Sequence, residues 1–190
     1  MTTLVAVTVS NGVWIGADSA ITDSGDRRCR ELEPFAKWDF LDGWALGLSG
    51  CPLTAQAATT ALSEIKRWLQ QDATFEKLLM ARCTLLRAYT DYNVPVKEGH
   101  YKASGMLVGD GKVWDIGSSG VFLPGTPGKL FASGSGADFA LGAWQVQEQL
   151  TECDSYFGKL TCCLEAARHY DIYTGSELWV KFLDRDGKFV

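Results

Sequence analysis

Short runs of β-branched and apolar residues, separated by turn signals, open the chain. Residues 4–9 and 13–17 are two such runs, and the Ser-Asn-Gly sequence at 10–12 between them is typical of a tight turn. The pattern predicts a β-hairpin whose second strand ends at Asp18, across from the start of the first strand. A carboxylate at the end of a buried strand is held rigidly, as a functional site requires, but local sequence alone favours an Asx turn at Asp18.

The same two periodicities predict the remaining elements. Apolar residues at helical spacing indicate helices over residues 51–71, 75–92, 137–150 and 159–170. Shorter β-like runs, bounded by turn residues, indicate strands at 35–41, 44–48, 104–108, 113–116, 121–123, 129–132, 177–183 and 188–190. The polar residues 22–33 are expected to form a loop or an irregular strand. Strands and helix pairs in this order predict the α+β class, with helices outside stacked antiparallel sheets.

Composition limits the classes of protein that fit this pattern. A chain of 190 residues that is 46% hydrophobic is the size of one globular domain, which we expect to span residues 1–190. Its six cysteines lack metal-ligand spacing and indicate reduced thiols, so no metal and no cofactor are expected. The absence of a membrane-length apolar run or a signal sequence favours a soluble cytoplasmic protein that binds no membrane. A net charge of -5 without a dense Lys/Arg run argues against nucleic acid as a partner.

Thr2 is the candidate nucleophile. Removal of Met1 would leave Thr2 with both a hydroxyl and a free α-amine, and such an amine can act as the base that activates the hydroxyl. An α-amine has an ordinary pKa of about 7.7 to 8.0, close to working pH. Many chains begin with Met-Thr, however, so this dipeptide alone is weak support.

An ordered set of short motifs runs along the chain. The set comprises Thr2-Thr3, Gly16-Ala17-Asp18-Ser19, Lys37, Leu48-Ser49-Gly50, Gly134-Ser135-Gly136 with Phe139-Ala140-Leu141-Gly142, and Asp171-Ile172-Tyr173-Thr174-Gly175. In this order and spacing, the set resembles the proteasome β-subunit family, including its bacterial relative HslV, over nearly the whole chain. The resemblance implies the N-terminal nucleophile hydrolase fold, a four-layer αββα sandwich of two antiparallel sheets flanked by helix pairs. It also implies a threonine endopeptidase.

The resemblance assigns a role to each matching residue. The Thr2 hydroxyl would attack the peptide carbonyl, Lys37 would lower the effective pKa of the nucleophilic system, and Asp18 would pair with that lysine. Gly50 would stabilise the oxyanion through its backbone N–H, at a point where a strand meets a helix N-terminus. The remaining matches, Ser135, Asp171 and Thr174, would surround the threonine amine.

Plainer interpretations of several of these residues remain open. Lys37 fits a solvated lysine in an alternating strand, Gly50 fits an ordinary tight turn, and Ser135 fits a helix cap. The tryptophans fit either the core or contacts between ring subunits; they include positions 38, 44, 68, 114, 144 and 179.

Substrate and partners also follow from the resemblance. The predicted substrate-binding residues are Ile21, Thr22, Phe35, Leu48 and Pro52, and this largely apolar lining predicts a preference for hydrophobic side chains before the cleaved bond. The expected partners are copies of the chain in a ring or double ring, an unfolding ATPase and polypeptide substrates. A structural cation near Asp171 and Thr174 is conceivable from the family, although nothing local demands one.

Departures from the family pattern place the chain in a divergent branch, such as the smaller bacterial or phage-borne homologues. HslV sequences usually carry cysteine at the position of Asp171, and the segment between Asp18 and Lys37 is about three residues longer than usual. Two other functions stay open: an inactive ring subunit, and an N-terminal nucleophile amidase that acts on a small molecule without a ring.

Overall fold

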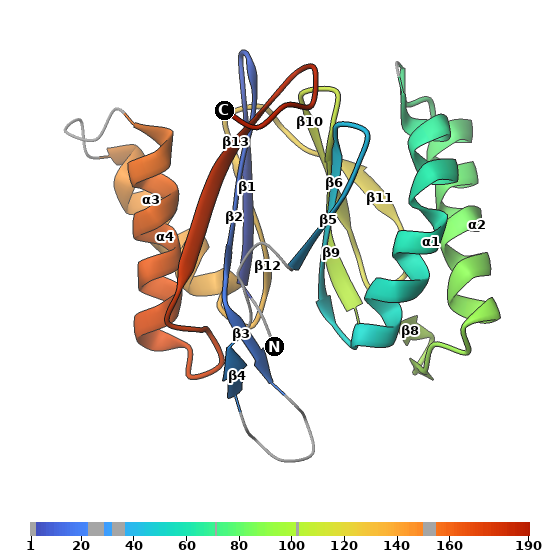
Figure 1. Cartoon of the computed structure of the whole chain (residues 1–190), viewed down its shortest axis with the longest axis horizontal. Coiled ribbons are helices and arrows are strands. Elements are labelled where there is room, and N and C mark those ends of the chain that lie inside the picture. The colour runs from blue at the N-terminus through green and yellow to red at the C-terminus, as the bar shows by residue number, and fades with distance from the viewer. Residues whose placement is uncertain (1–2, 23–28, 32–36, 71, 102, 150–154) are drawn as a thin grey trace.

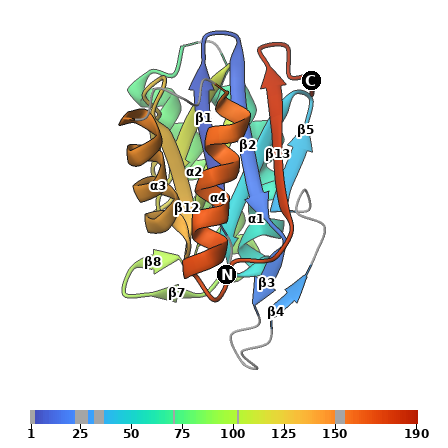
Figure 2. The ribbon, with the colours of Figure 1, turned by 90° about the vertical axis from the view of Figure 1, so that its left-hand side faces the viewer.

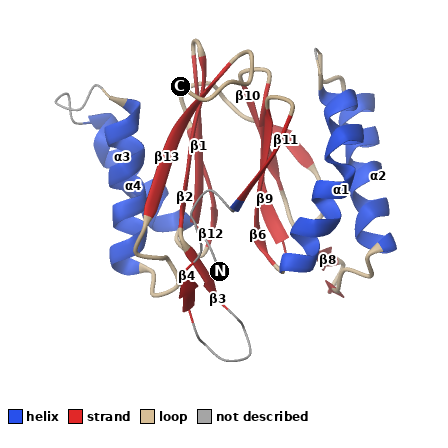
Figure 3. Ribbon diagram, viewed as in Figure 1, coloured by secondary structure: helices blue, strands red, loops and turns tan. Residues whose placement is uncertain are grey.

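Two antiparallel sheets lie face to face, and a pair of helices covers the outer face of each one (Figure 1). This computed structural model describes residues 3–22, 29–31, 37–70, 72–101, 103–149 and 155–190, with residues 21, 22 and 29–31 described by their backbone alone. Colouring by secondary structure shows the order helix, sheet, sheet, helix across the molecule (Figure 3). The predicted four-layer αββα sandwich is confirmed.

The first sheet is built around the N-terminal hairpin. Its four strands, in spatial order, are β12 (Leu130–Gly134), β1 (Thr3–Val9), β2 (Gly12–Asp18) and β13 (Leu178–Asp184). The register pairs Leu4 with Ala17, so β2 ends beside the first residue of β1. This confirms the predicted hairpin.

The second sheet contains the middle strands of the chain. Its spatial order is β11 (Phe122–Pro124), β10 (Lys112–Ile116), β9 (Ala103–Gly109), β6 (Trp44–Gly50) and β5 (Trp38–Leu41). Two small hairpins lie outside the main sheets: β3 (Ala20–Thr22) with β4 (Cys29–Glu31), and β7 (Val96–Lys97) with β8 (His100–Tyr101). Figure 2 shows α4 (Tyr156–Tyr170) lying over the first sheet.

The two helix pairs form the outer layers. On the second sheet lie α1 (Pro52–Leu69) and α2 (Phe75–Asp91), and on the first lie α3 (Ala137–Gln149) and α4 (Tyr156–Tyr170). A proline at the first turn of α1 is compatible with a helix start, because the N–H that proline lacks has no partner within the helix. No helix among the described residues is long and apolar enough to cross a membrane.

Apolar side chains fill the three interfaces between the four layers. Leu4, Ile15 and Met106 belong to the cluster between the sheets. Trp114 packs in the cluster under α1 and α2, and Leu164 in the cluster under α3 and α4. Because strand side chains alternate between faces, one strand can supply both an inter-sheet and a helix-facing cluster.

The structure corrects several predicted boundaries. α4 begins at Tyr156 rather than at 159, because the Ser155 hydroxyl caps it by accepting a hydrogen bond from the Gly158 N–H (3.5 Å). The predicted strand at 188–190 is reduced to an isolated bridge between Leu183 and Phe189. In the polar segment 22–33, residue 22 is the last residue of β3, and residues 29–31 form β4. Of the six tryptophans named above, those at 38, 44, 114 and 144 are buried in the core.

Candidate active site

Asp18 is the centre of a dense hydrogen-bond network at one end of the first sheet. It is fully buried, and its carboxylate accepts four hydrogen bonds from the described residues. Oδ1 receives the backbone N–H of Thr3 (2.6 Å) and the Nζ of Lys37 (2.6 Å). Oδ2 receives the backbone N–H groups of Ala20 (2.9 Å) and Gly175 (2.6 Å). The Ala20 contact is that of an Asx turn, but an Asx turn does not account for the other three donors, which lie far from Asp18 in the sequence.

Lys37 lies immediately before β5 and reaches the end of β2 to form a buried ion pair. Its side chain is 4% exposed, and that of Asp18 is fully buried. The plain interpretation of Lys37 as a solvated strand lysine is therefore wrong. The extra length of the segment that separates Lys37 from Asp18 has not displaced the lysine from the carboxylate.

A second network surrounds Asp171, the residue that follows the last turn of α4. Its Oδ2 accepts the hydroxyls of Ser135 (2.6 Å) and Thr174 (2.9 Å), and its Oδ1 accepts the backbone N–H of Tyr173 (3.1 Å). Ser135 lies between β12 and α3, so its hydroxyl ties the start of one helix to the end of the other. The structure thus brings together Ser135, Asp171 and Thr174, as predicted.

Thr3 joins the two networks, and sequence reasoning gave it no role. Its backbone N–H binds Asp18, and its side-chain hydroxyl lies 2.8 Å from that of Thr174. A Cβ at Gly136 would lie 2.2 Å from the Thr3 hydroxyl, so this packing excludes any larger residue there. Strand alternation was the available signal: Thr3, like Val5, points towards the layer of α3 and α4.

Gly50 is the last residue of β6, two positions before α1 begins. Its φ of +124° is a conformation that residues with a side chain rarely adopt, so the position requires glycine. The N-cap residue of α1, Cys51, makes no side-chain cap hydrogen bond. The first-turn N–H groups of a helix carry partial positive charge, which suits the binding of an anionic oxygen. Within the described part of the chain, Gly50 forms no direct hydrogen bond with Asp18 or Asp171.

The predicted substrate-binding residues are only partly described. Leu48 is half-buried and packs against the cluster under α1 and α2, while Pro52 is exposed at the first position of α1. Ile21 and Thr22 belong to β3, and Phe35 lies outside the described residues. The apolar substrate pocket stays a prediction. The proposed nucleophile Thr2 also lies outside the described residues, directly before Thr3.

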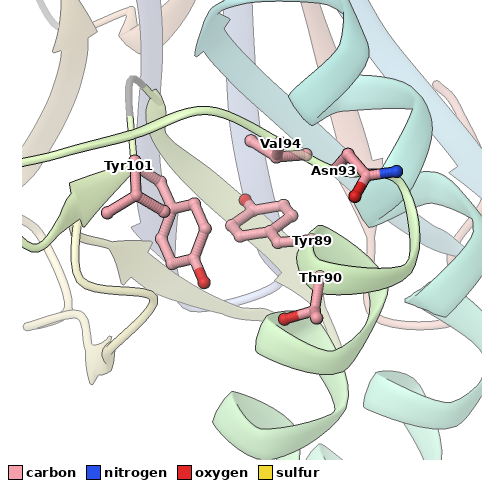
Figure 4. Close-up of a pocket in the computed structure, with 6 residues that line it drawn as sticks. Tyr89, Thr90, Asn93, Val94 and Tyr101 are labelled. Atoms are coloured by element: carbon pink, nitrogen blue, oxygen red, sulfur yellow. The ribbon is translucent and has the colours of Figure 1, made fainter.

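A hollow of about 310 Å³ lies elsewhere, at the C-terminal end of α2 beside β7 and β8 (Figure 4). Its lining residues are Tyr89, Thr90, Asn93, Val94, Val96 and Tyr101, none of them a predicted site residue. Burial, and secondarily the neighbouring Tyr101, raise the pKa of the Tyr89 hydroxyl well above its ordinary value. Tyr89 therefore stays neutral at working pH, and we assign this hollow no catalytic chemistry.

The described part of the chain contains no cluster of metal ligands. No group of three or more His, Cys, Asp or Glu residues there is placed to hold an ion. The carboxylate of Asp171 already accepts three hydrogen bonds from protein groups. A cation near Asp171 and Thr174 stays a prediction.

The likeness to solved structures is in the fold. HslV from Trypanosoma brucei superposes with a TM-score of 0.75 at 18% identity, over 96% of this chain and 99% of that one. BPH from Thiobacillus denitrificans, in complex with epoxomicin, gives 0.70 at 15% identity, over 96% and 98%. An Anbu Gly-1 mutant from Hyphomicrobium sp. strain MC1 gives 0.68 at 13% identity, over 100% and 85%.

Comparison of the sequence itself finds no match to any protein-family model or curated protein. The chain nevertheless has the fold of HslV, the N-terminal nucleophile hydrolase fold that the sequence motifs predicted. At 13 to 18% identity, this likeness carries the fold and leaves the activity to be argued from the site.

Proposed function

We propose that this chain is an N-terminal threonine endopeptidase whose nucleophile, Thr2, is exposed by removal of Met1. One observation carries the proposal: two buried polar networks, centred on Asp18 and Asp171, meet on Thr3, the residue that follows the proposed nucleophile. A buried ion pair is a weak source of stability, because the loss of hydration offsets much of the attraction between the charges. A buried pair that adds little stability and lies against Thr3 therefore supports a functional role for Asp18 and Lys37.

The proposed chemistry uses the groups already described. The Thr2 hydroxyl would attack the peptide carbonyl carbon while its proton passes to the α-amine of the same residue. The positive charge of Lys37, held by Asp18, would favour the developing alkoxide and the neutral amine. The backbone N–H of Gly50 would bind the oxyanion of the tetrahedral intermediate.

In the next step, the proton moves from the α-amine of Thr2 to the leaving group. The protonated amine would pass it to the departing amino group as the carbon–nitrogen bond breaks, leaving an ester on Thr2. Attack by water on this ester would release the acid product and the free hydroxyl. The Ser135, Asp171 and Thr174 network lies on the α3 and α4 side of Thr3, where we expect it to orient the amine during both transfers.

The test is covalent labelling. BPH, which shares the fold, was solved in complex with epoxomicin. Epoxomicin is an epoxyketone, a group that reacts with an N-terminal threonine through both its hydroxyl and its amine. We expect the intact mass of the untreated protein to be lower than that of the full chain by one methionine. Treatment with epoxomicin should then add one adduct per chain. Thr2→Ala should abolish the adduct, and Thr2→Ser, which keeps a hydroxyl and an amine, should retain it.

Other outcomes select the alternative functions. A full-length mass with no adduct in protein from its native host would reject the proposal in favour of an inactive ring subunit. An adduct on a monomer that cleaves small amides but not peptides would instead indicate an N-terminal nucleophile amidase.

A further inference from the structure

Three serine side chains form a closed cluster between the two sheets. The Ser49 and Ser133 hydroxyl oxygens lie 3.1 Å apart, those of Ser104 and Ser133 lie 2.9 Å apart, and those of Ser49 and Ser104 lie 3.2 Å apart. The Ser49 hydroxyl also donates to the Ser104 carbonyl (2.9 Å). Ser49 and Ser104 face each other across β6 and β9, while Ser133 belongs to β12 in the other sheet.

This serine cluster lies between two parts of the proposed site. Ser49 directly precedes Gly50, the proposed oxyanion donor. Ser133 pairs with Leu4 in β1, and the next residue of β12 pairs with Thr3. The cluster therefore connects the strand that ends at Gly50 with the strand beside Thr3.

Away from this cluster, the contacts between the sheets are largely apolar and involve residues such as Leu4, Ile15 and Met106. Apolar packing has little directional preference, so sheets held only by such contacts can slide slightly against each other. Hydrogen bonds fix distance and angle. In the described part of the chain, side-chain hydrogen bonds cross between the main sheets at this cluster and, just before β5, between Lys37 and Asp18. Both links lie at the end of the sandwich that carries the site.

We propose that the serine cluster is a positioning element of the active site. By joining β6 to β12, it fixes the Gly50 N–H relative to Thr3, and hence to the nucleophile that precedes Thr3. This inference rests on the proposed function, because positioning has a consequence only if Gly50 and Thr2 act on one substrate. A displacement of about 1 Å at a reacting centre can cost about a hundredfold in rate, so a partial loosening should cost about tenfold.

The experiment is a double-mutant cycle across the sheets. Ser49→Ala and Ser133→Ala, singly and together, are assayed for kcat and KM on a fluorogenic peptide with an apolar residue before the cleaved bond. We expect each single variant to lower kcat about tenfold and leave KM within about twofold, because substrate binding is retained while the oxyanion is misplaced. The double variant should be no slower than Ser133→Ala alone, because Ser133→Ala already removes both hydroxyl contacts of the cluster that cross between the sheets.

A matched control comes from the other end of the same interface. Thr8 lies on the inward face of β1, four residues beyond Leu4, and its buried hydroxyl has no hydrogen-bond partner among the residues that the structure describes. Thr8→Val should leave kcat unchanged. If either cluster variant fails to fold, Ser104→Ala replaces it, because Ser104 is only half-buried.

The outcomes separate this inference from the proposed function. An active wild type whose cluster variants keep kcat within twofold would overturn the positioning role, as would a double variant slowed by the product of the two single effects. A wild type that neither cleaves peptides nor takes an epoxomicin adduct would overturn the proposed function, and this inference with it.

Discussion

At the residue scale, Asp18 is the best defined part of the site. Four donors hold both of its oxygens, and three of them come from distant segments, so its position depends on the tertiary fold. Thr3 then extends the network towards Asp171. Thr3 and Gly175 are both distant from Asp18 in the sequence. Strand pairing brings Thr3 to Asp18, and the turn after α4 brings Gly175 to it.

Replacing Asp18 tests this arrangement directly. Asp18→Asn keeps the shape of the side chain, but it removes the negative charge opposite buried Lys37 and places an NH₂ group against N–H donors. We expect a loss of about 3 to 5 kcal/mol in the free energy of unfolding, measured by urea denaturation. The matched control is Asp42→Asn, which breaks the Lys66–Asp42 pair (3.7 Å) at an exposed carboxylate and should cost less than about 1 kcal/mol. Equal effects of the two variants would contradict the assigned importance of Asp18.

At the element scale, the orientation of α4 about its axis places two adjacent cysteines in different environments. Cys162 is exposed and its neighbour Cys163 is fully buried against the first sheet. Burial, and secondarily Cys162, raise the pKa of the Cys163 thiol to about 12. An unfolded thiol has a pKa of about 8.5, so the folded state keeps the Cys163 proton at higher pH than the unfolded state does. This contribution to stability is therefore complete below about pH 8.5 and is lost as the pH rises towards 12.

Thiol alkylation tests the rotation of α4. With iodoacetamide at pH 8, native protein should be alkylated at Cys162 and not at Cys163, because the raised pKa lowers the thiolate fraction of Cys163 about a thousandfold and burial blocks access. Peptide mass mapping measures the two sites. Protein unfolded in guanidinium chloride is the control, in which both cysteines should react. Comparable rates in the native protein would show that α4 is misoriented or locally open.

At the scale of the whole molecule, large apolar side chains remain exposed beside the site. Ile172 is 83% exposed and Tyr170 is 66% exposed, and the Tyr170 ring stacks on that of Phe139 with centroids 5.6 Å apart. Apolar side chains gathered on a surface favour association with another surface. They are compatible with the ring of identical chains that the sequence resemblance predicts.

Sedimentation velocity of the native protein tests this assembly. We expect a species several times heavier than the 20.8 kDa chain, because a ring contains several copies. Thr2→Ala is the control and should sediment in the same way, since assembly does not require the nucleophile. A single species of one chain mass at micromolar concentration would contradict the ring, and would favour the amidase alternative if epoxomicin still labels Thr2.

The sequence by itself determined the four helices, the strands of the two main sheets, their order and most of the candidate site. The continuous apolar runs at residues 4–9 and 13–17, and the helical spacing from residue 51 onwards, are local properties of the sequence. The order of the family motifs identified five further site residues: Asp18, Lys37, Ser135, Asp171 and Thr174. In the structure, Lys37 is hydrogen-bonded to Asp18, and Ser135 and Thr174 are hydrogen-bonded to Asp171. The start of α4 was misjudged because Tyr156, Phe157 and Gly158 carry no helical pattern, whereas the cap at Ser155 acts through hydrogen-bond geometry.

Only the tertiary structure decided which distant strands became neighbours. β12 pairs with β1, and β13 pairs with β2, although more than a hundred residues separate the members of each pair. No local pattern specifies such pairing, because it depends on how complete layers bury their apolar faces together. The link of Thr3 to Thr174 and the serine cluster across the sheets both arise from that pairing. The residues of the candidate site could therefore be predicted from the sequence, whereas the contacts that position them depend on how the layers pack.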